Sequence, residues 1–522
     1  MRNLTPVPPV TRRSGRTTVL LLLGVSLLGL AALAPRGAAA LQAGGAITRG
    51  AQPALVASEV DQLVRVAAGA SAGDRMAVTV VDRAGRVLAV WHRVNATDAE
   101  AERSLSLART GAFFANNQAP LSSRTVRFIS GIHFPPGVKN QPSAPLYGIE
   151  NTNRVSRQIP YEFGKEYPEP LNLEQDGPSL GISTGKVDLM DSSPRAVDAG
   201  GFPVYKNGQV VGGVGVSGVD PLSAEWAAFL PTVAIPGIQN PYDPRRDVIF
   251  ADGIALPFVA KPLLNAALAG RQPRGVRRGT FADGNYRAGF EPRDGGIAPD
   301  GYLVRPAASP ELSEAEVTRI VDQSLAAARA TRALIRLPLG SRTRMVIAVG
   351  DLNGNILAVY RMQDSTIFSI DVAVAKARNV VYFSGPDRLR SDLPGLPIGT
   401  AVTNRSISFG AQPLFPSGID NSRPGPFFDL FKFDTQNPGT QGADSSPNPK
   451  NGIVFFPGSI PLYKDGRLVG GLGISGDGVE QDDFVAHNGA KGFLPPRDIR
   501  ADNYRIRGVR IPFLKFPRNP LD

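Results

Sequence analysis

The sequence predicts an α+β fold built from two similar units, each with an antiparallel sheet and flanking helices. Three observations lead to this fold class: a glycine-rich pattern that occurs twice, tight-turn signals between short apolar runs, and helical spacing of apolar residues nearby. The pattern runs from Gly200 to Gly218 and again from Gly458 to Gly476. The two stretches align without a gap and share Gly, Pro, Tyr, Lys and a run of glycines, so the chain is a tandem duplication.

Each glycine-rich stretch is typical of a strand, a tight turn and a second strand. Asn207-Gly208 and Asp465-Gly466 are the turns, because both residue types tolerate positive φ. In the second copy, Leu468, Leu472 and Ile474 alternate with glycines, as in a strand that packs closely against another backbone. We therefore expect a hairpin at the centre of each unit.

The remaining elements follow the same order in both copies. In the first copy we expect a helix at 54–68, strands at 76–81 and 86–91, a helix at 99–115, a helix near 223–229 and a closing strand at 252–258. In the second copy we expect a helix at 314–332, strands at 345–349 and 356–360, a helix at 369–383, a helix near 481–486 and a closing strand at 507–513. Ser313, with Glu316 three positions on, is a capping box.

These matches set the predicted domain boundaries. The first repeat spans 54–262 and the second 311–517, and residues 263–310 form a linker rich in Arg, Gly and Pro that we expect on the surface. Residues 1–40 predict a cleaved secretory signal peptide: arginines precede an apolar run from Val19 to Ala34, and small residues end at Ala40. The alternative is an uncleaved anchor, but the run is shorter than the ~20 residues of a spanning helix.

Charge and cysteine content exclude several classes of function. Removal of residues 1–40 takes away five arginines and no acidic residue, so the net charge falls from +11 to +6, without a Lys/Arg block that would indicate nucleic-acid binding. The chain has no cysteine, which excludes thiol catalysis, iron–sulfur clusters and c-type haem attachment.

Residues of the second copy resemble the GlcG/HbpS family of haem-binding proteins. The resemblance rests on 451–458 (Asn-Gly-Ile-Val-Phe-Phe-Pro-Gly), the hairpin, Glu480-Gln481-Asp482, and Lys376-Ala377-Arg378 in the second helix. It covers both copies and implies two tandem α/β sandwich domains, profilin-like in shape and usually oligomeric. It also implies haem or a similar tetrapyrrole as ligand, with haem degradation in some members. The first copy departs at 195–199 and 221–223, so ligand binding is expected mainly of the second.

The candidate cofactor-binding residues are His133, Arg109, Lys376, Arg378, Phe415 and Phe455. His133 lies among Phe128, Phe134 and prolines and is the candidate axial, metal-binding ligand; the alternative is a packing or surface role. Arg109, its counterpart Arg378, and Lys376 are candidate partners of haem carboxylates; the alternative is a solvated helix face. Phe415 and Phe455 would supply apolar walls.

Other chemistries are less favoured. Gly213-x-Gly215-x-x-Gly218 and its counterpart at 471–476 fit a dinucleotide fingerprint, but the preceding strand belongs to a hairpin and no carboxylate follows at the required spacing. Close packing of strand against helix explains these glycines better. The acids Asp477, Glu480, Asp482 and Asp483 suit a helix N-terminus better than a metal site.

The sequence therefore predicts an exported haem (tetrapyrrole)-binding protein, periplasmic or secreted, acting in haem sequestration or degradation. The alternative is a non-catalytic scaffold of tandem GlcG-like domains. No catalytic residue is assigned, since no Ser-His-Asp spacing occurs in both copies. The expected partners are haem or a similar planar anionic ligand and other copies of the chain. Nucleic acid, and a stable membrane span after cleavage, are not expected.

Overall fold

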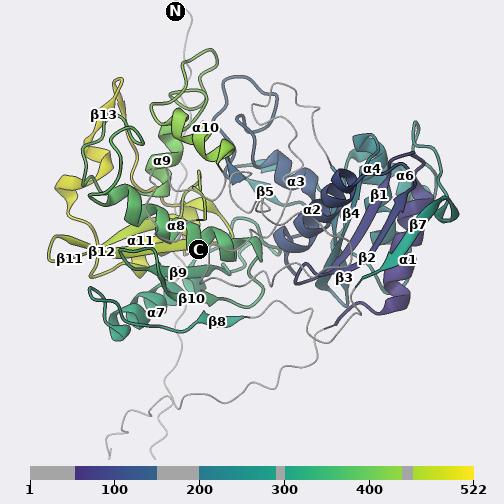
Figure 1. Cartoon of the computed structure of the whole chain (residues 1–522), viewed down its shortest axis with the longest axis horizontal. Helices are drawn as coiled ribbons and strands as arrows, with labels where there is room; N and C mark the ends of the chain where they lie inside the picture. The colour runs from purple at the N-terminus through teal and green to yellow at the C-terminus, as the bar shows by residue number, and fades with distance from the viewer. Residues whose placement is uncertain (1–52, 150–198, 290–299, 438–450, 522) are drawn as a thin grey trace, which may run out of the picture. The chain divides into compact units, whose positions relative to one another are not determined.

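The computed structural model describes residues 53–149, 199–289, 300–437 and 451–521 (Figure 1). The predicted signal segment 1–40, the Asp-Ser-Ser-Pro motifs at 191–194 and 444–447, and most of the departure at 195–199 lie outside these residues. We keep the terms first repeat for 54–262 and second repeat for 311–517, whose boundaries stay a prediction. No helix of the described residues is long and apolar enough to cross a membrane.

Both repeats show the predicted order of elements. The first repeat contains α1 (Ala57–Ala70), β1 (Ala77–Asp82), β2 (Val87–Arg93), α2 (Asp98–Phe114), α3 (Ser123–Phe128), β3 (Gly201–Lys206), β4 (Gln209–Ser217), α4 (Pro221–Phe229), α5 (Pro231–Ala234), β5 (Phe250–Ala251) and β6 (Ile254–Ala255), and α6 (Lys261–Leu268) begins at its end and runs into the predicted linker. The second contains α7 (Glu314–Ala330), β9 (Val346–Gly350), β10 (Ile356–Arg361), α8 (Phe368–Ser384), α9 (Asn404–Gly410), α10 (Phe428–Gln436), β11 (Ser459–Lys464), β12 (Arg467–Ser475), α11 (Val479–Gly489), β13 (Arg505–Ile506) and β14 (Val509–Arg510). The predicted capping box of α7 is present between Ser313 and Glu316.

Each repeat has a five-stranded antiparallel sheet, which confirms the predicted fold class. The strand order is β3-β4-β1-β2-β7 in the first sheet and β11-β12-β9-β10-β8 in the second. The outermost strands β7 (Gly284–Ala288) and β8 (Gly301–Val304) come from the segment predicted as a linker. That segment therefore contributes one edge strand to each sheet in addition to joining the repeats.

The glycines of the central hairpins allow helix and sheet to pack at very short range. A Cβ atom built on Gly471 would lie 2.2 Å from the carbonyl oxygen of Ala377 in α8, and one on Gly213 would lie 2.1 Å from that of Ala108 in α2. Both are impossible contacts, so these positions require glycine. The close-packing interpretation of the glycine pattern is confirmed.

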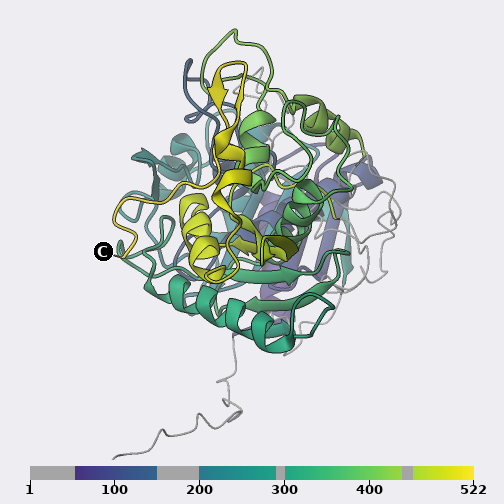
Figure 2. The ribbon, with the colours of Figure 1, turned by 90° about the vertical axis from the view of Figure 1, so that its left-hand side faces the viewer.

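The helices form layers on both sides of each sheet. In the first repeat, α2 packs on the face that carries the glycines of β4, while α1 and α4 cover the opposite face with Val214 and Val216. In the second repeat, α8 takes the place of α2, and α7 and α11 lie side by side on the other face (Figure 2). α2 and α8 are also covered on the side away from their sheets, because residues of both helices belong to one shared hydrophobic cluster.

Two expectations about local structure are wrong. The segments 252–258 and 507–513 are not continuous strands. Each begins at a turn inside a very short hairpin, β5–β6 or β13–β14, with positive φ at Asp252-Gly253 and Arg507-Gly508. Five short helices were not predicted, since their sequences carry no long apolar period: α3, α5, α6, α9 and α10.

Candidate functional site

Lys376 lies in the middle of α8 and is fully buried. Its ammonium group donates hydrogen bonds to the carbonyl oxygen of Ile474 (2.7 Å) and to Oδ2 of Asp482 (3.0 Å). It also lies 4.9 Å from the ring centre of Phe456. Because a buried cation must be paired, Asp482 is the residue that allows Lys376 to stay charged inside the fold. The solvated-face alternative is therefore wrong for Lys376.

The neighbouring acid Asp483 forms a second ion pair, and this one occurs in both repeats. Asp483 pairs with Arg405 of α9 and accepts a hydrogen bond from the backbone of Gly458 (3.0 Å). At the equivalent place in the first repeat, Arg124 of α3 binds Glu225 of α4 through two hydrogen bonds of 2.6 Å. This shared ion pair fastens the same two helices in each repeat, so we assign it a structural role.

The Lys376–Asp482 pair, in contrast, has no counterpart in the first repeat. The alignment of Ala108 with Ala377 and of Gly215 with Gly473 places Leu107 opposite Lys376 and Ala224 opposite Asp482. The first repeat builds the same sheet and helices with these two apolar residues. Since the fold does not require a buried ion pair at this place, the pair is the best candidate for a functional feature of the second repeat.

Burial brings this pair close to its titration range. Burial raises the pKa of Asp482 to about 7, although Lys376 opposes the shift. Burial also lowers the pKa of Lys376, against the attraction of Asp482 and Asp483. Both side chains are thus shifted toward their neutral forms, so a proton can join or leave the pair near neutral pH.

A small pocket opens beside Asp482, with walls from both repeats. Its walls are mostly apolar and include Phe114, Phe368, Phe456 and Val479. The rings of Phe114 and Phe368 stack with centroids 4.0 Å apart and planes 11° apart. Oδ1 of Asp482 is buried, and no described residue donates a hydrogen bond to it. The pocket volume is about 30 Å³, which is enough for one water-sized group.

Arg109 and Arg378 occupy matching places and make the same contact. Nε of Arg109 donates to the carbonyl oxygen of Gly85 (3.0 Å), and Nε of Arg378 donates to that of Gly354 (2.8 Å). Both carbonyls belong to the turn that joins the first two strands of a sheet, and both arginines are buried. The solvated-face alternative is wrong for them too, and each arginine holds a turn against the long helix behind it.

His133 and Phe415 lie in two equivalent loops that contact each other. Nε2 of His133 is 2.8 Å from Oδ1 of Asp420, and the backbone of Asp420 donates to Oδ1 of Asn140 (3.0 Å). Nδ1 of His133 is buried without a partner among the described residues. Phe415 packs edge-on against Phe409 at 5.4 Å. His133 therefore joins the two repeats through a carboxylate.

Phe455 is fully buried in the core of the second repeat, edge-on to Phe431 at 5.1 Å. The six predicted site residues thus lie at five separate places, and none of them lines the pocket beside Asp482. Lys376 contacts two residues that line this pocket, Asp482 and Phe456. The assignment of the six residues to a cofactor stays a prediction.

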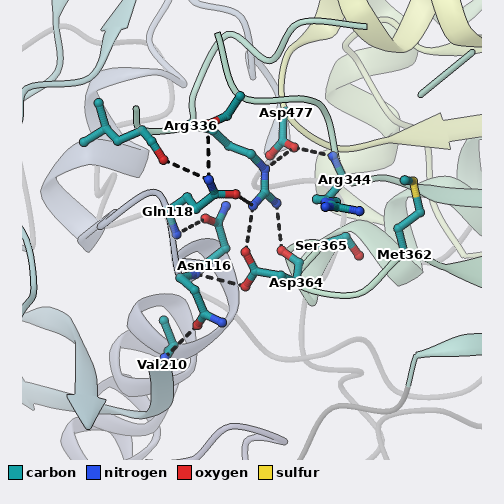
Figure 3. A network of polar contacts seen from close by, with 12 residues as sticks. Asn116, Gln118, Val210, Arg336, Arg344, Met362, Asp364, Ser365 and Asp477 are labelled. Carbon is teal, nitrogen blue, oxygen red and sulfur yellow. Dashed lines mark hydrogen bonds and ion pairs between the residues drawn. The ribbon is translucent and has the colours of Figure 1, made fainter. Parts of the chain in front are cut away.

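A second polar network, which the sequence did not indicate, joins the repeats around Arg336 (Figure 3). The fully buried guanidinium of Arg336 contacts Asp477 (2.5 Å) and Asp364 (2.7 Å) in its own repeat and Oε1 of Gln118 (3.1 Å) in the first. Asp364 in turn accepts a hydrogen bond from the backbone of Asn117 (2.9 Å). The partners are 28 to 218 positions apart in the chain, so no local pattern could reveal them. Within the described ranges, no group of three His, Cys, Asp or Glu side chains could hold a metal ion.

Comparison with known proteins finds a family model that is similar to part of the second repeat. Residues 315–491 match the family model described as "Haem degrading protein HbpS-like". No curated protein sequence matches the chain. The matched range contains both members of the Lys376–Asp482 pair.

Three solved structures are similar to part of the chain. A PduOC:Heme complex has 22% identity and a TM-score of 0.23, and covers 35% of this chain and 94% of that one. Klebsiella pneumoniae protein ORFY has 18% identity and a TM-score of 0.23, with 34% and 88% covered. A double mutant of Streptomyces reticuli HbpS has 19% identity and a TM-score of 0.21, with 37% and 94% covered. The fold assignment above rests on the sheets and helices of this chain.

Proposed function

We propose that the second repeat binds haem or another planar, anionic tetrapyrrole, because residues 315–491 match the family model described as "Haem degrading protein HbpS-like". The observation that carries this proposal is the buried Lys376–Asp482 pair beside an aromatic pocket. The family match covers the second repeat only, and the first repeat has Leu107 and Ala224 in place of the pair. The cation and the family match therefore coincide in the same half of the chain.

The proposed ligand position is the pocket between Phe368, Phe456 and Asp482. Flat aromatic rings stack well on a planar ligand, and Phe114 and Phe368 already stack face to face there. Ligand pockets of this kind usually have volumes of about 300–1,000 Å³, so the pocket walls must separate to admit a tetrapyrrole. The unpartnered Oδ1 of Asp482 gives this surface a polar group that a ligand can satisfy.

Lys376 is the residue proposed to hold a ligand carboxylate. When Asp482 is ionised, it competes with the ligand for the ammonium group of Lys376. When Asp482 is protonated, it no longer competes and can itself donate a hydrogen bond. A bound haem would supply an iron centre, and His133 is the residue that would bind the iron. Its Nε2 atom would first have to leave Asp420.

A haemin titration followed by absorbance tests the proposal. We expect a Soret band that saturates at micromolar haemin, with tighter binding at pH 6 than at pH 8. The pKa of about 7 for Asp482 means that above this pH binding must take up a proton, which weakens affinity by up to about tenfold per pH unit. Asp482→Asn should remove most of this pH dependence.

Two variants test, in the same haemin titration, whether His133 binds the haem iron. His133→Ala should shift the Soret band if His133 is the axial ligand, while Arg510→Ala, a change at an exposed ion pair, should leave it in place. Absence of any spectral change with the wild-type protein at micromolar haemin would contradict the proposal.

A second candidate function, a non-catalytic scaffold, is favoured by two observations. The pocket is small, and the cations predicted to bind carboxylates already have partners inside the protein. A titration without a haem signal, together with recovery of a protein partner, would favour this candidate.

We also propose that residues 1–40 direct export and are removed. This proposal depends on the arginine, apolar and small-residue pattern of that segment. N-terminal sequencing of the mature protein should give Leu41 as the first residue. An intact Met1 in exported protein would contradict the proposal.

A further inference from the structure

Two adjoining grooves lie among α1, α4 and α5 of the first repeat and α6 with the residues that follow it. One groove has a volume of about 340 Å³ and is lined by apolar residues of α1, α4 and α5. The other has a volume of about 610 Å³ and is lined mainly by α6 and the residues that follow it. Arg271 and Gln272 line both, so the two grooves meet there. Neither shares a residue with the pocket beside Asp482.

The wall between the grooves is fixed to the end of α1. α6 is followed by Gly270, whose φ of 61° turns the chain back toward α1. The side chain of Gln272 then donates to the carbonyl oxygen of Ala70 (2.7 Å). Two backbone hydrogen bonds join the same segment to the end of α1. The N–H of Ala72 donates to the carbonyl oxygen of Arg277 (2.8 Å), and the N–H of Gly279 donates to that of Gly69 (3.1 Å). The carbonyls of Gly69 and Ala70 at the end of α1 thereby have partners, and this side of the groove is fastened to α1.

Trp226 lines the smaller groove and carries a buried hydrogen-bond donor without an acceptor. Trp226 is 2% exposed, and its indole N–H has no partner among the described residues. Around it the groove is lined by Val66, Leu230 and Val233, and Val233 is 39% exposed. A buried N–H that lacks an acceptor is unfavourable, so a ligand oxygen that accepts from Trp226 would stabilise this site.

The rim of the two grooves is positively charged. Lys261, Arg271, Arg274 and Arg278 line them and are exposed. In the described part of the chain, none of these four cations forms an ion pair, and no acidic residue lines either groove. An apolar channel with a cationic rim is complementary to a molecule with an apolar tail and an anionic head.

The second repeat does not carry this arrangement. Phe484 of α11 stands at the position equivalent to Trp226, so the indole N–H is absent, and its ring packs edge-on against Phe516 at 5.6 Å. The site is therefore a property of the first repeat alone.

We propose that the double groove of the first repeat binds a single-chain amphiphile with an anionic head, such as an alkyl phosphate or a fatty acid. The tail lies along Val66, Leu230 and Val233, and the head lies near Arg271, between the two grooves. Trp226 donates its indole N–H to an oxygen of the ligand. This site is independent of the tetrapyrrole site proposed for the second repeat.

Monododecyl phosphate, kept below its aggregation concentration, is the probe. The chain has two tryptophans, Trp91 and Trp226, and Trp91 already donates its N–H to Phe281, so Trp226 is the natural reporter. We expect a saturable change in tryptophan fluorescence with one molecule bound per chain. The Trp226→Phe variant lacks the reporter tryptophan, so its binding is measured by titration calorimetry. We expect it to bind the probe about fivefold more weakly than the wild-type protein does, which is the effect of one lost hydrogen bond.

Two further variants locate the tail and the head. Gly69→Leu should abolish binding, because a Cβ at Gly69 points into open space in the smaller groove and leucine favours a helix more than glycine does. Arg271→Glu/Arg274→Glu should weaken binding about tenfold. The matched reversal Arg390→Glu/Arg467→Glu, at exposed residues of the second repeat, should leave binding unchanged.

Three outcomes would overturn the proposal. The first is equal binding of the Gly69→Leu variant and the wild-type protein. The second is full competition by inorganic phosphate alone at the same concentration, which would show that the apolar groove contributes nothing. The third is binding to phosphatidylglycerol vesicles without a response to monomeric dodecyl phosphate, which would assign the surface to membrane contact.

Discussion

Replacement of Lys376 by leucine alone is expected to destabilise the protein by about 3–5 kcal/mol at pH 8, because Asp482 would stay buried without its cation. The double variant Lys376→Leu/Asp482→Ala should recover most of this loss. It gives the second repeat the residues that the first repeat already uses, Leu107 and Ala224. Urea unfolding followed by circular dichroism measures both free energies of unfolding.

The pH dependence of the single variant provides a control. Burial raises the pKa of Asp482, so below about pH 7 the folded protein binds a proton at this carboxyl more readily than the unfolded chain does. The destabilisation should therefore shrink as the pH falls from 8 toward 5. A double variant as unstable as the single variant would show that the pair is structural, and would remove the argument for its functional role.

Replacement of Arg336 by methionine is expected to cost about 3–5 kcal/mol, since Asp477 would be left fully buried without its ion pair. The same change removes the contacts to Asp364 and Gln118, so part of the loss should appear as weaker coupling between the repeats. Equilibrium unfolding, followed separately by tryptophan fluorescence of the first repeat and by far-ultraviolet circular dichroism, should give two transitions in place of one.

An exposed ion pair supplies the matched control for Arg336. Arg510 is 61% exposed and contacts Asp502 at 3.0 Å, so Arg510→Met should change the free energy of unfolding by at most about 1 kcal/mol. Equal effects of the two substitutions would contradict the interpretation that the Arg336 network is a buried connection between the repeats.

The fold was largely predictable because its signals are local. The turns at Asn207-Gly208 and Asp465-Gly466, the capping box at Ser313 and the helical periods each depend on residues a few positions apart. The edge strands β7 and β8 were missed because their sequences of five and four residues are too short to show an alternating pattern, and they become strands by pairing with β2 and β10. Their pairing is set by tertiary context, which a single sequence does not display.

The candidate site was less predictable, since burial of a charged residue is a long-range property. Lys376 and Arg378 are on a helix that is buried on nearly all sides, which no helical period distinguishes from a half-exposed one. Asp482 was assigned to a helix N-terminus, and its partner is 106 positions away. Comparison of Lys376 with Leu107 in the aligned repeats was the one sequence signal that could have marked the pair.

The edge strands supplied by residues between the repeats also bear on solubility. A sheet whose outer strand is unpaired offers free backbone N–H and C=O groups on which other chains stack. In this protein β7 covers β2 and β8 covers β10. A repeat separated from this segment would expose the longer, largely buried strand β2 or β10 as its edge in place of the short strand β7 or β8. The stretch that ties the two halves together therefore gives each sheet a shorter edge, which is less prone to pair with other chains.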